Sequence, residues 1–298
     1  MDVEEICEIG EMAMTITTKT QLCGVLGNPV HHSLSPAIHN AAFRHLGLNF
    51  VYLALPVVDD VEGAIRGIRA LGNLRGFSVT IPHKVAVMPY LDEIDATARH
   101  IGSVNTIIKN QDTLTGYNTD ATGALQALRL GGAQLTGQRI LLLGSGGAAR
   151  AIAFGLVVEG EIEHLTILGI DERERASLVK DLRERTAVSV SEAPVNQESL
   201  ASGIADSHVL IHCTPIGMHP HVDTSCVEKS LWKPDLTVMD IVYNPLETQL
   251  LREAREAGCR TIRGVEMFVN QAVGQFERWT GESAPVDVMR AILEEHFR

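Results

Sequence analysis

Hydrophobic and polar positions form two series of short apolar runs separated by amphipathic segments. The first series begins at Leu22 and predicts strands at 22–26, 50–55 and 76–79 and helices at 37–46, 61–71 and 83–91. Strands that alternate with helices form a mainly parallel sheet. We therefore expect an α/β domain in the first part of the chain.

A second series follows Asp120 and has the order of a doubly wound nucleotide-binding domain. A helix to Leu130 precedes predicted strands at 140–143, 165–168, 209–212, 237–242 and 260–262, with helices from Ala148 and over 173–185. From Phe268 to its end the chain is again predicted helical, and we expect this segment to pack on the first domain. Residues 1–14 are acidic and lie outside the pattern, so we treat them as an extension.

A glycine-rich turn follows the apolar strand that ends at Leu143. It reads Gly144-Ser145-Gly146-Gly147-Ala148-Ala149, the dinucleotide fingerprint with alanine in the third glycine position. Bare backbone lets a pyrophosphate approach the first amides of the helix and the positive end of its dipole. We predict a dinucleotide site here. The alternative is a turn that only packs helix against strand.

Asp171 follows the next predicted strand, where a carboxylate accepts hydrogen bonds from ribose hydroxyls and repels a 2′-phosphate. This position favours NAD over NADP. Arg173 and Arg175 are close by and offer the opposite charge to a phosphate. In the alternative, Asp171 is only a helix N-cap, and Glu172 complements the helix dipole.

Two short polar turns supply one amine, Lys84, and one carboxylate, Asp120. Such a pair suits proton transfer and, beside a dinucleotide site, suggests hydride transfer. We place Lys84 at the start of a helix and expect it to donate, as an ammonium, to a forming alkoxide. Taken singly, Lys84 is an ordinary solvated amine, and Asp120 is the N-cap of a helix that begins at Ala121.

Ser33 and Ser35 are two residues apart, so in an extended stretch both hydroxyls lie on one side and bind one anion together. Pro36 is expected as the first helical residue, which makes Ser35 its N-cap. The two roles are compatible, because the same helix start directs its dipole toward a carboxylate.

Composition narrows the class of protein. The 298 residues carry 25 Lys and Arg against 37 Asp and Glu, and this net charge of −12 argues against nucleic acid or anionic membrane as a partner. The five cysteines have no C-x-x-C spacing, so we expect neither disulfides nor a zinc knuckle, and a reducing cytoplasm fits. We expect a small-molecule substrate and a monomer or homodimer.

A histidine cluster invites a metal hypothesis, with His208, His212, His219 and His221 near Cys213. The set lacks an accompanying carboxylate cluster and surrounds a proline-containing turn. We therefore expect a polar loop and no metal site.

The chain resembles the shikimate dehydrogenase family from about Thr15 to its end. The stretches that carry the resemblance are Gly27 to Pro36, Val79 to Lys84, Gly102 to Thr106, Gly116 to Asp120, Gly144 to Arg150, Thr214 to Met218, Asp240 to Pro245 and Gly264 through Gln271 to Gly281. The resemblance implies a two-domain α/β protein. Residues 1–119 and 264–298 would form the substrate-binding, catalytic domain, and 120–263 an inserted Rossmann domain that binds NAD or NADP.

The resemblance also implies site residues. Ser33 and Ser35, helped by Tyr243, would bind the substrate carboxylate, while Lys84 and Asp120 would flank the reacting oxygen. The residues implied to hold ring hydroxyls are Thr80, Asn105 and Gln271. The residues that we expect to contact the cofactor are Gly144, Ser145, Gly146, Gly147, Ala148, Asp171, Arg175, Thr214, Ile241 and Gly264.

Three departures from the family pattern bear on function. Ser78 stands where the family typically has Asn, and Ile170-Asp171-Glu172 replaces the Asn-Arg-Thr of NADP-dependent members. Glu266 and Phe268 replace residues that are often Gly and Leu, near the expected nicotinamide.

The resemblance implies reversible reduction of 3-dehydroshikimate to shikimate. One rival is an NAD-dependent quinate/shikimate dehydrogenase with a catabolic role, which Asp171 favours. Another is a ligand sensor without catalysis, which would be expected to lack Lys84 or Asp120. A folate-type dehydrogenase shares only the general layout and leaves the paired serines unexplained.

Overall fold

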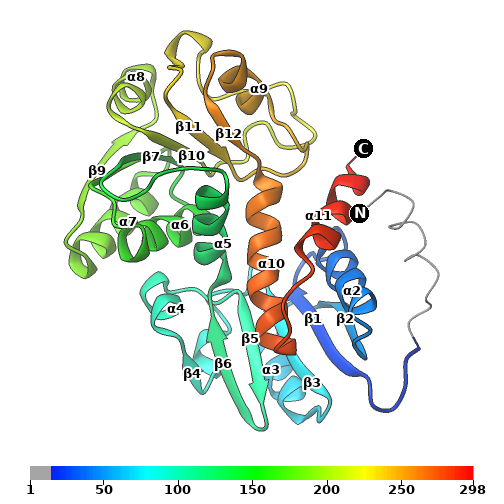
Figure 1. The fold of residues 1–298 in the computed structure, drawn as a ribbon. Helices are drawn as coiled ribbons and strands as arrows, with labels where there is room; N and C mark the ends of the chain where they lie inside the picture. The colour runs from blue at the N-terminus through cyan, green and yellow to red at the C-terminus, as the bar shows by residue number, and fades with distance from the viewer. Residues whose placement is uncertain (1–14, 298) are drawn as a thin grey trace. The chain divides into compact units, whose positions relative to one another are not determined.

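The computed structural model describes residues 15–297, and these form two compact units (Figure 1). The described part of the first unit runs from residue 15 to Tyr117 and includes Ala272–His296, while the second contains Asn118–Gln271. The units thus change at 117/118, two residues before the expected 119/120, and at 271/272, eight residues after the expected 263/264. The acidic stretch 1–14 lies outside the described residues.

The first unit contains a six-stranded sheet with the strand order β2-β1-β3-β5-β6-β4. The strands are β1 (Gln21–Gly27), β2 (Phe50–Pro56), β3 (Leu74–Val79), β4 (Glu93–Ile94), β5 (Thr106–Asn110) and β6 (Thr113–Tyr117). β5 runs antiparallel to both neighbours and the other pairs are parallel, which confirms a mainly parallel α/β sheet. The β5–β6 hairpin was not among the predicted strands, although its runs of Thr and Ile around Asn110-Gln111-Asp112 are typical of one.

Helices cover both faces of this sheet, and the alternation along β3 explains how. The helices are α2 (Ser35–His45), α3 (Val61–Ala70), α4 (Ala96–Ile101), α11 (Val286–His296) and the last part of α10 (Gly264–Thr280). Phe77 and Val79 pack in one hydrophobic cluster with Ile65 of α3. The alternate residues Gly76 and Ser78 face α10, because side chains of a strand point to opposite faces in turn.

The expected helix at 83–91 is wrong. Residues after Pro82 form turns and then a short 3-10 helix, η2 (Met88–Tyr90). Pro89 accounts for this, because an α-helix through the segment would need a backbone N–H at residue 89 that proline lacks. Lys84 therefore lies in a turn and not at a helix start.

The second unit contains a six-stranded sheet in the order β12-β11-β10-β7-β8-β9, with every neighbouring pair parallel. Its strands are β7 (Arg139–Leu143), β8 (His164–Gly169), β9 (Ser189–Pro194), β10 (Val209–His212), β11 (Thr237–Asp240) and β12 (Arg260–Ile262). The expected doubly wound sheet is confirmed. Its edge strand β9 and the helix after it were not predicted.

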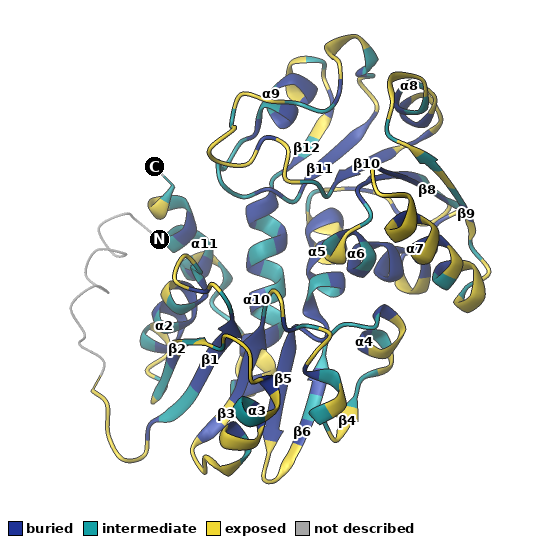
Figure 2. Ribbon diagram, turned by 180° about the vertical axis from the view of Figure 1, so that it is seen from behind, coloured by how far each residue is buried: buried dark blue, intermediate teal, exposed yellow. Residues whose placement is uncertain are grey.

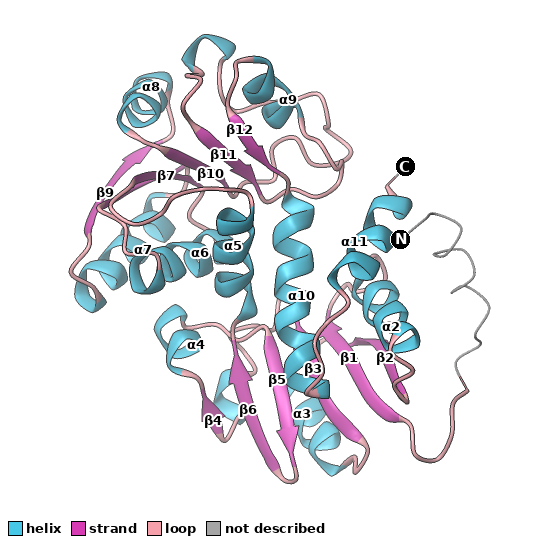
Figure 3. Cartoon of the chain, in the orientation of Figure 1, coloured by secondary structure: helices cyan, strands magenta, loops and turns pink. Residues whose placement is uncertain are grey.

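The helices of the second unit lie on both faces of the sheet (Figure 3). They are α5 (Thr119–Leu130), α6 (Gly147–Glu159), α7 (Glu172–Arg185), α8 (Gln197–Asp206) and α9 (Gln249–Glu256), with the first part of α10. On the α8 and α9 side, Leu141 and Leu143 pack with Ile204 and Leu250. The four inner strands β7, β8, β10 and β11 are correspondingly buried along most of their length (Figure 2).

Within residues 15–297, none of the helices combines the length and the apolarity that crossing a membrane requires. In the same part of the chain, no three His, Cys, Asp or Glu side chains gather as a group that would hold a metal ion.

Candidate active site

The two serines lie at the start of α2, but not as expected. The helix begins at Ser35, its N-cap is Leu34 in a near-helical conformation, and no side chain of the described residues caps it. Ser33 Oγ instead accepts a hydrogen bond from the Ser35 backbone N–H at 3.3 Å. The expectation of an extended stretch with Ser35 as N-cap is therefore wrong. Ser33 is half-buried, and Ser35 is buried with 7% of its surface exposed.

Thr80 follows β3 at the edge of the sheet where β1 also ends. Its backbone N–H donates to the Leu26 carbonyl at 2.9 Å, which continues the pairing of the two strands. A Cβ on Gly27 would lie 2.3 Å from Thr80 Cγ2, so only glycine lets the two segments approach this closely. Thr80 itself remains half-buried at this edge.

Lys84 and Asn105 meet the same edge of the first sheet. The Lys84 carbonyl accepts from the Val104 N–H at 2.9 Å, so the turn that carries Lys84 is tied to the residue before Asn105. Asn105 is 2% exposed, and its backbone bridges Val79 and Tyr117. Parallel α/β sheets hold ligands at the carboxyl ends of their strands. Ser33, Ser35, Thr80, Lys84 and Asn105 all lie at this kind of edge in the first unit.

Asp120 belongs to the second unit, in the first turn of α5. The N-cap of this helix is Asn118, whose Oδ1 accepts from the N–H groups of Asp120 at 3.0 Å and Ala121 at 3.4 Å. The interpretation of Asp120 as the N-cap is therefore wrong. One turn later, a Cβ on Gly123 would lie 2.7 Å from the backbone nitrogen of Gln271, so α5 and α10 pack closely here.

The glycine-rich turn connects β7 to α6 at the carboxyl edge of the second sheet. Gly144 has φ +115°, which glycine adopts readily, and its N–H donates to the Leu168 carbonyl at 2.7 Å. Gly146 is the N-cap, and no described side chain caps the helix. A Cβ on Gly146 or Gly147 would meet no atom within 4 Å. The turn therefore has the open, amide-rich geometry that a phosphate needs.

Asp171 is the N-cap of α7 and accepts from the Glu174 N–H at 2.9 Å. Its carboxylate is exposed, as are those of Glu172 and Glu174. Arg175 differs from its expected role, because it is buried and its guanidinium donates to Glu192 Oε2 and to the Gly169 carbonyl, both at 2.7 Å. Its charge is thus balanced within the fold. Arg173 is exposed.

The carboxyl ends of β10 and β11 lie near four more of the expected site residues. Three of them, Thr214, Ile241 and Gly264, were expected at the cofactor, and the fourth is Tyr243. Thr214 follows β10, and Ile241 follows β11. A Cβ on Gly264 would lie 2.5 Å from the Ile241 carbonyl, so the start of α10 packs directly on this segment. The Tyr243 ring lies 4.9 Å from that of Phe268, and burial raises the pKa of Tyr243.

The sequence analysis missed a buried ion pair between these loops. His212 Nδ1 donates to Asp240 Oδ1 at 2.9 Å, and both side chains are fully buried. His212 Nε2 lies 2.5 Å from Thr214 Oγ1, while Asp240 accepts from the Val242 N–H at 3.0 Å and the Thr248 hydroxyl at 2.7 Å. The expectation that these histidines form only a polar loop is wrong for His212. The pairing of β10 with β11 sets His212 opposite Asp240, and the sequence carries no local signal for that register.

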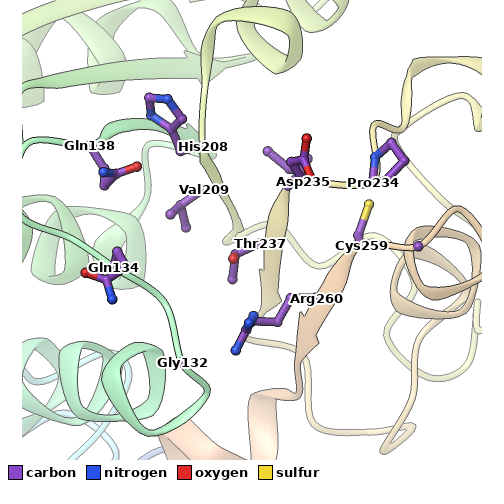
Figure 4. Close-up of a pocket in the computed structure, with 12 residues that line it drawn as sticks. Gly132, Gln134, Gln138, His208, Val209, Pro234, Asp235, Thr237, Cys259 and Arg260 are labelled. Atoms are coloured by element: carbon purple, nitrogen blue, oxygen red, sulfur yellow. The ribbon is translucent and has the colours of Figure 1, made fainter.

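A cavity of about 580 Å³ opens at the other edge of the second sheet, where β10, β11 and β12 begin (Figure 4). Gln134, Gln138, His208 and Arg260 line it. His208 Nδ1 already accepts from the Arg139 N–H, and Arg260 donates to the Gly131 carbonyl. Because parallel sheets hold ligands at their carboxyl edge, we do not include this cavity in the candidate site.

Comparison with known proteins agrees with this arrangement. A family model described as the shikimate dehydrogenase substrate binding domain matches residues 25–107, and one for the shikimate 5′-dehydrogenase C-terminal domain matches 264–294. A shikimate dehydrogenase (NADP(+)) from Methanopyrus kandleri is 43% identical over 296 residues, which covers 96% of this chain and 99% of the relative.

Two solved structures extend the comparison. Shikimate 5-dehydrogenase from Listeria monocytogenes in complex with shikimate and NAD has a TM-score of 0.90 at 35% identity, covering 95% of this chain and 99% of that one. Quinate dehydrogenase from Corynebacterium glutamicum in complex with NAD has a TM-score of 0.85 at 29% identity, covering 93% of this chain and 99% of that one. The resemblance in the sequence is thus confirmed, and the chain belongs to the shikimate dehydrogenase family.

Proposed function

We propose that this chain catalyses the reversible reduction of 3-dehydroshikimate to shikimate with a nicotinamide dinucleotide. The observation that carries the proposal is the match over nearly the whole chain to shikimate dehydrogenases. The polar cluster at the edge of the first sheet and the open glycine-rich turn in the second unit support it, because they provide the two kinds of site that the reaction needs.

The first unit is proposed to hold the substrate. Ser33 and Ser35, at the start of α2, would donate hydroxyl hydrogen bonds to the substrate carboxylate, with Tyr243 as a further donor. Thr80 and Asn105, with Gln271, would bind ring hydroxyls, since hydroxyl and amide groups both donate and accept. These contacts would fix the ring relative to Lys84.

Lys84 and Asp120 are proposed to handle the proton. As an ammonium, Lys84 would donate a proton to the carbonyl oxygen while that oxygen becomes an alkoxide. In the reverse direction, the neutral Lys84 amine would accept the alcohol proton. The Asp120 carboxylate would stabilise the ammonium form. The bound nicotinamide supplies the hydride.

The second unit is proposed to bind the dinucleotide. The Gly146 and Gly147 segment fits a pyrophosphate, because these residues are exposed and space around them is open. The finer proposal is a preference for NAD. Asp171, Glu172 and Glu174 present carboxylates where an adenosine ribose would lie, and Arg175 is engaged with Glu192. A 2′-phosphate would meet repulsion there, although curated relatives are named for NADP(+).

The proposed catalytic role of Lys84 is tested by Lys84→Ala. Shikimate oxidation should fall by roughly two to four orders of magnitude, with dinucleotide affinity nearly unchanged. Lys19→Ala, at an exposed lysine of the same unit, is the control and should retain activity. Unchanged turnover in Lys84→Ala would exclude the assigned role.

A second candidate is an NAD-dependent quinate/shikimate dehydrogenase, which the Asp171 carboxylate favours. The likeness to the quinate dehydrogenase from Corynebacterium glutamicum adds to it. Steady-state kcat/KM values for shikimate and quinate, each with NAD and NADP, separate the two functions. Higher efficiency with quinate and NAD would support the second candidate, and higher efficiency with NADP would contradict the proposed cofactor preference.

A further inference from the structure

A chain of buried polar side chains crosses the first unit between its sheet and α10. Its members are Tyr52 of β2, Ser78 of β3, Gln275 of α10, Thr106 of β5 and Asn105, and none is more than 6% exposed. Gln275 lies on the helix drawn in orange in Figure 1. Asn105 is one of the residues that the proposed function assigns to the substrate.

The hydrogen bonds of this chain all run in one direction. The Tyr52 hydroxyl donates to Ser78 Oγ at 2.7 Å, and Ser78 Oγ donates to Gln275 Oε1 at 2.9 Å. Gln275 Nε2 donates to Thr106 Oγ1 at 3.1 Å, and Thr106 Oγ1 donates to Asn105 Oδ1 at 2.7 Å. Because Ser78 and Thr106 each donate and accept, these bonds polarise one another and strengthen the chain.

Gln275 determines this direction. Among the inner members of the chain it is the one whose donor and acceptor are different atoms, and both are engaged. A second hydrogen bond, from Nε2 to the Asn105 carbonyl at 3.4 Å, holds the amide in the same orientation. Turning the amide over would place Nε2 beside the Ser78 hydroxyl and Oε1 beside the Asn105 carbonyl. The second contact would bring two acceptors together, which cannot form a hydrogen bond.

The consequence reaches the Asn105 side chain. Since Oδ1 accepts from Thr106, the donor end of this amide, Nδ2, is turned away from the Thr106 hydroxyl.

The surroundings of Gln275 are buried and aromatic. Phe276 and Trp279 of α10 are at most 1% exposed, and the buried His39 ring stacks on Tyr52 with centroids 4.6 Å apart. Apolar side chains would fill this space with little net loss of stability, because a buried hydrogen bond contributes only modestly when both partners leave water. What an amide adds here is a defined orientation of the groups beside it.

We propose that Gln275 is a positioning residue of the substrate site, which orients the Asn105 amide so that Nδ2 donates to a ring hydroxyl of the substrate. The assignment rests on the proposed function. Gln275 itself acts through Thr106 and Asn105 and need not contact the substrate.

The test compares Gln275→Leu, Thr106→Val and Thr106→Ser in the full-length chain, with shikimate as substrate. Gln275→Leu and Thr106→Val should raise the KM for shikimate about tenfold, as one misdirected hydrogen bond would. The values of kcat and of KM for the dinucleotide should stay within about threefold, because the chain acts on binding of the ring. Thr106→Ser retains the hydroxyl and should restore the wild-type KM.

A double variant and a control make the test specific. Asn105→Ala combined with Gln275→Leu should be no worse than Asn105→Ala alone, since Gln275 acts through Asn105. Thr280→Val removes a hydroxyl at the end of the same helix, and the hydrogen bonds of this hydroxyl lie outside the chain of polar side chains. It donates to the Phe276 carbonyl at 2.8 Å and accepts from the Glu282 N–H at 3.1 Å. This variant should leave KM unchanged.

Two results would overturn the assignment. One is an unchanged KM for shikimate in both Gln275→Leu and Thr106→Val, and the other is a fully multiplicative effect in the double variant. If Gln275→Leu does not fold, the Thr106→Val and Thr106→Ser pair decides alone. A folded wild-type chain that fails to oxidise shikimate contradicts the proposed function itself, which is a separate outcome.

Discussion

The two units each bury a histidine completely, yet they treat it in opposite ways. In the first unit, burial lowers the pKa of His39 to about 3, and the neighbouring Gln275 offsets only part of this. Neither ring nitrogen has a hydrogen-bond partner among the described residues. Burial also disfavours the charged form of His212 in the second unit, but the bond to Asp240 and the nearby Cys226 raise its pKa to about 10.

The difference teaches that the hydrogen-bond partner of a buried histidine, and not its burial, decides whether the ring is charged. His39 lies among aromatic rings, so it remains neutral and acts as a flat, packed side chain. His212 is the last residue of β10, and it forms an ion pair with Asp240 at the end of the paired strand β11. The first unit therefore orients its site with neutral hydroxyls and amides, while the second uses a buried charge pair.

The largest expected effect comes from removing the acid of this pair. Asp240→Ala deletes an acceptor of three hydrogen bonds, from His212, Val242 and Thr248, and leaves the imidazolium unpaired. The free energy of unfolding should fall by about 3–5 kcal/mol. Urea unfolding measures this.

The matched control is Asp206→Ala, whose side chain is 58% exposed beside Arg139. It should cost at most about 1 kcal/mol, because exposed pairs contribute little. Equal losses in the two variants would remove the distinction between the buried pair and the surface pair.

The two histidines should also give opposite pH dependences of stability. The folded pKa of His39 lies below the ordinary value of 6.5, so the unfolded state binds more protons and stability falls as pH drops from about 6.5 toward 3. The folded pKa of His212 lies above 6.5, so its contribution is complete below that value and is lost as pH rises toward 10.

Each histidine should change the stability by about 1.4 kcal/mol per pH unit within its window. Unfolding of the wild type is compared with His39→Phe between pH 5 and 6.5, and with His212→Asn between pH 7 and 9. His39→Phe should weaken the pH dependence of stability between pH 5 and 6.5. His212→Asn should weaken it between pH 7 and 9. Parallel curves for a variant and the wild type would contradict the charge state given to that histidine.

A smaller effect is expected from breaking the neutral chain of the first unit. Ser78→Ala leaves the Tyr52 hydroxyl without its acceptor and Gln275 Oε1 without its donor. A buried polar group without a hydrogen-bond partner costs about 1–3 kcal/mol. The free energy of unfolding should therefore fall less than it does in Asp240→Ala. Ser189→Ala, at an exposed position of β9, is the control and should change stability by less than about 0.5 kcal/mol.

Local patterns predicted much of the fold and of the candidate site. The strand and turn at 139–149 were recognisable because a phosphate-binding turn is defined within a few consecutive residues. For Asp171, the helix N-cap was the alternative to a ribose-binding role, and Asp171 is the N-cap of α7. The prediction failed where a single residue prevented the secondary structure that the hydrophobic pattern indicated. Pro89 does this in the expected helix at 83–91.

Other features depend on contacts between distant segments. Arg175 was expected near a phosphate, but the pairing of β8 with β9 brings Glu192 to its guanidinium. His212 and Asp240 are 28 positions apart and become partners only through the register of β10 and β11. Neither pairing follows from the spacing of residues along the chain.

The sequence by itself determined the α/β class, the two sheets, the glycine-rich turn and the family, because these depend on periodicity and on short motifs. Only the tertiary structure decided which buried groups are charged, and which way the amides of Gln275 and Asn105 face. The reason is physical: a pKa and an amide orientation are set by the few atoms within hydrogen-bond distance, and here those atoms come from strands and helices far apart in the chain.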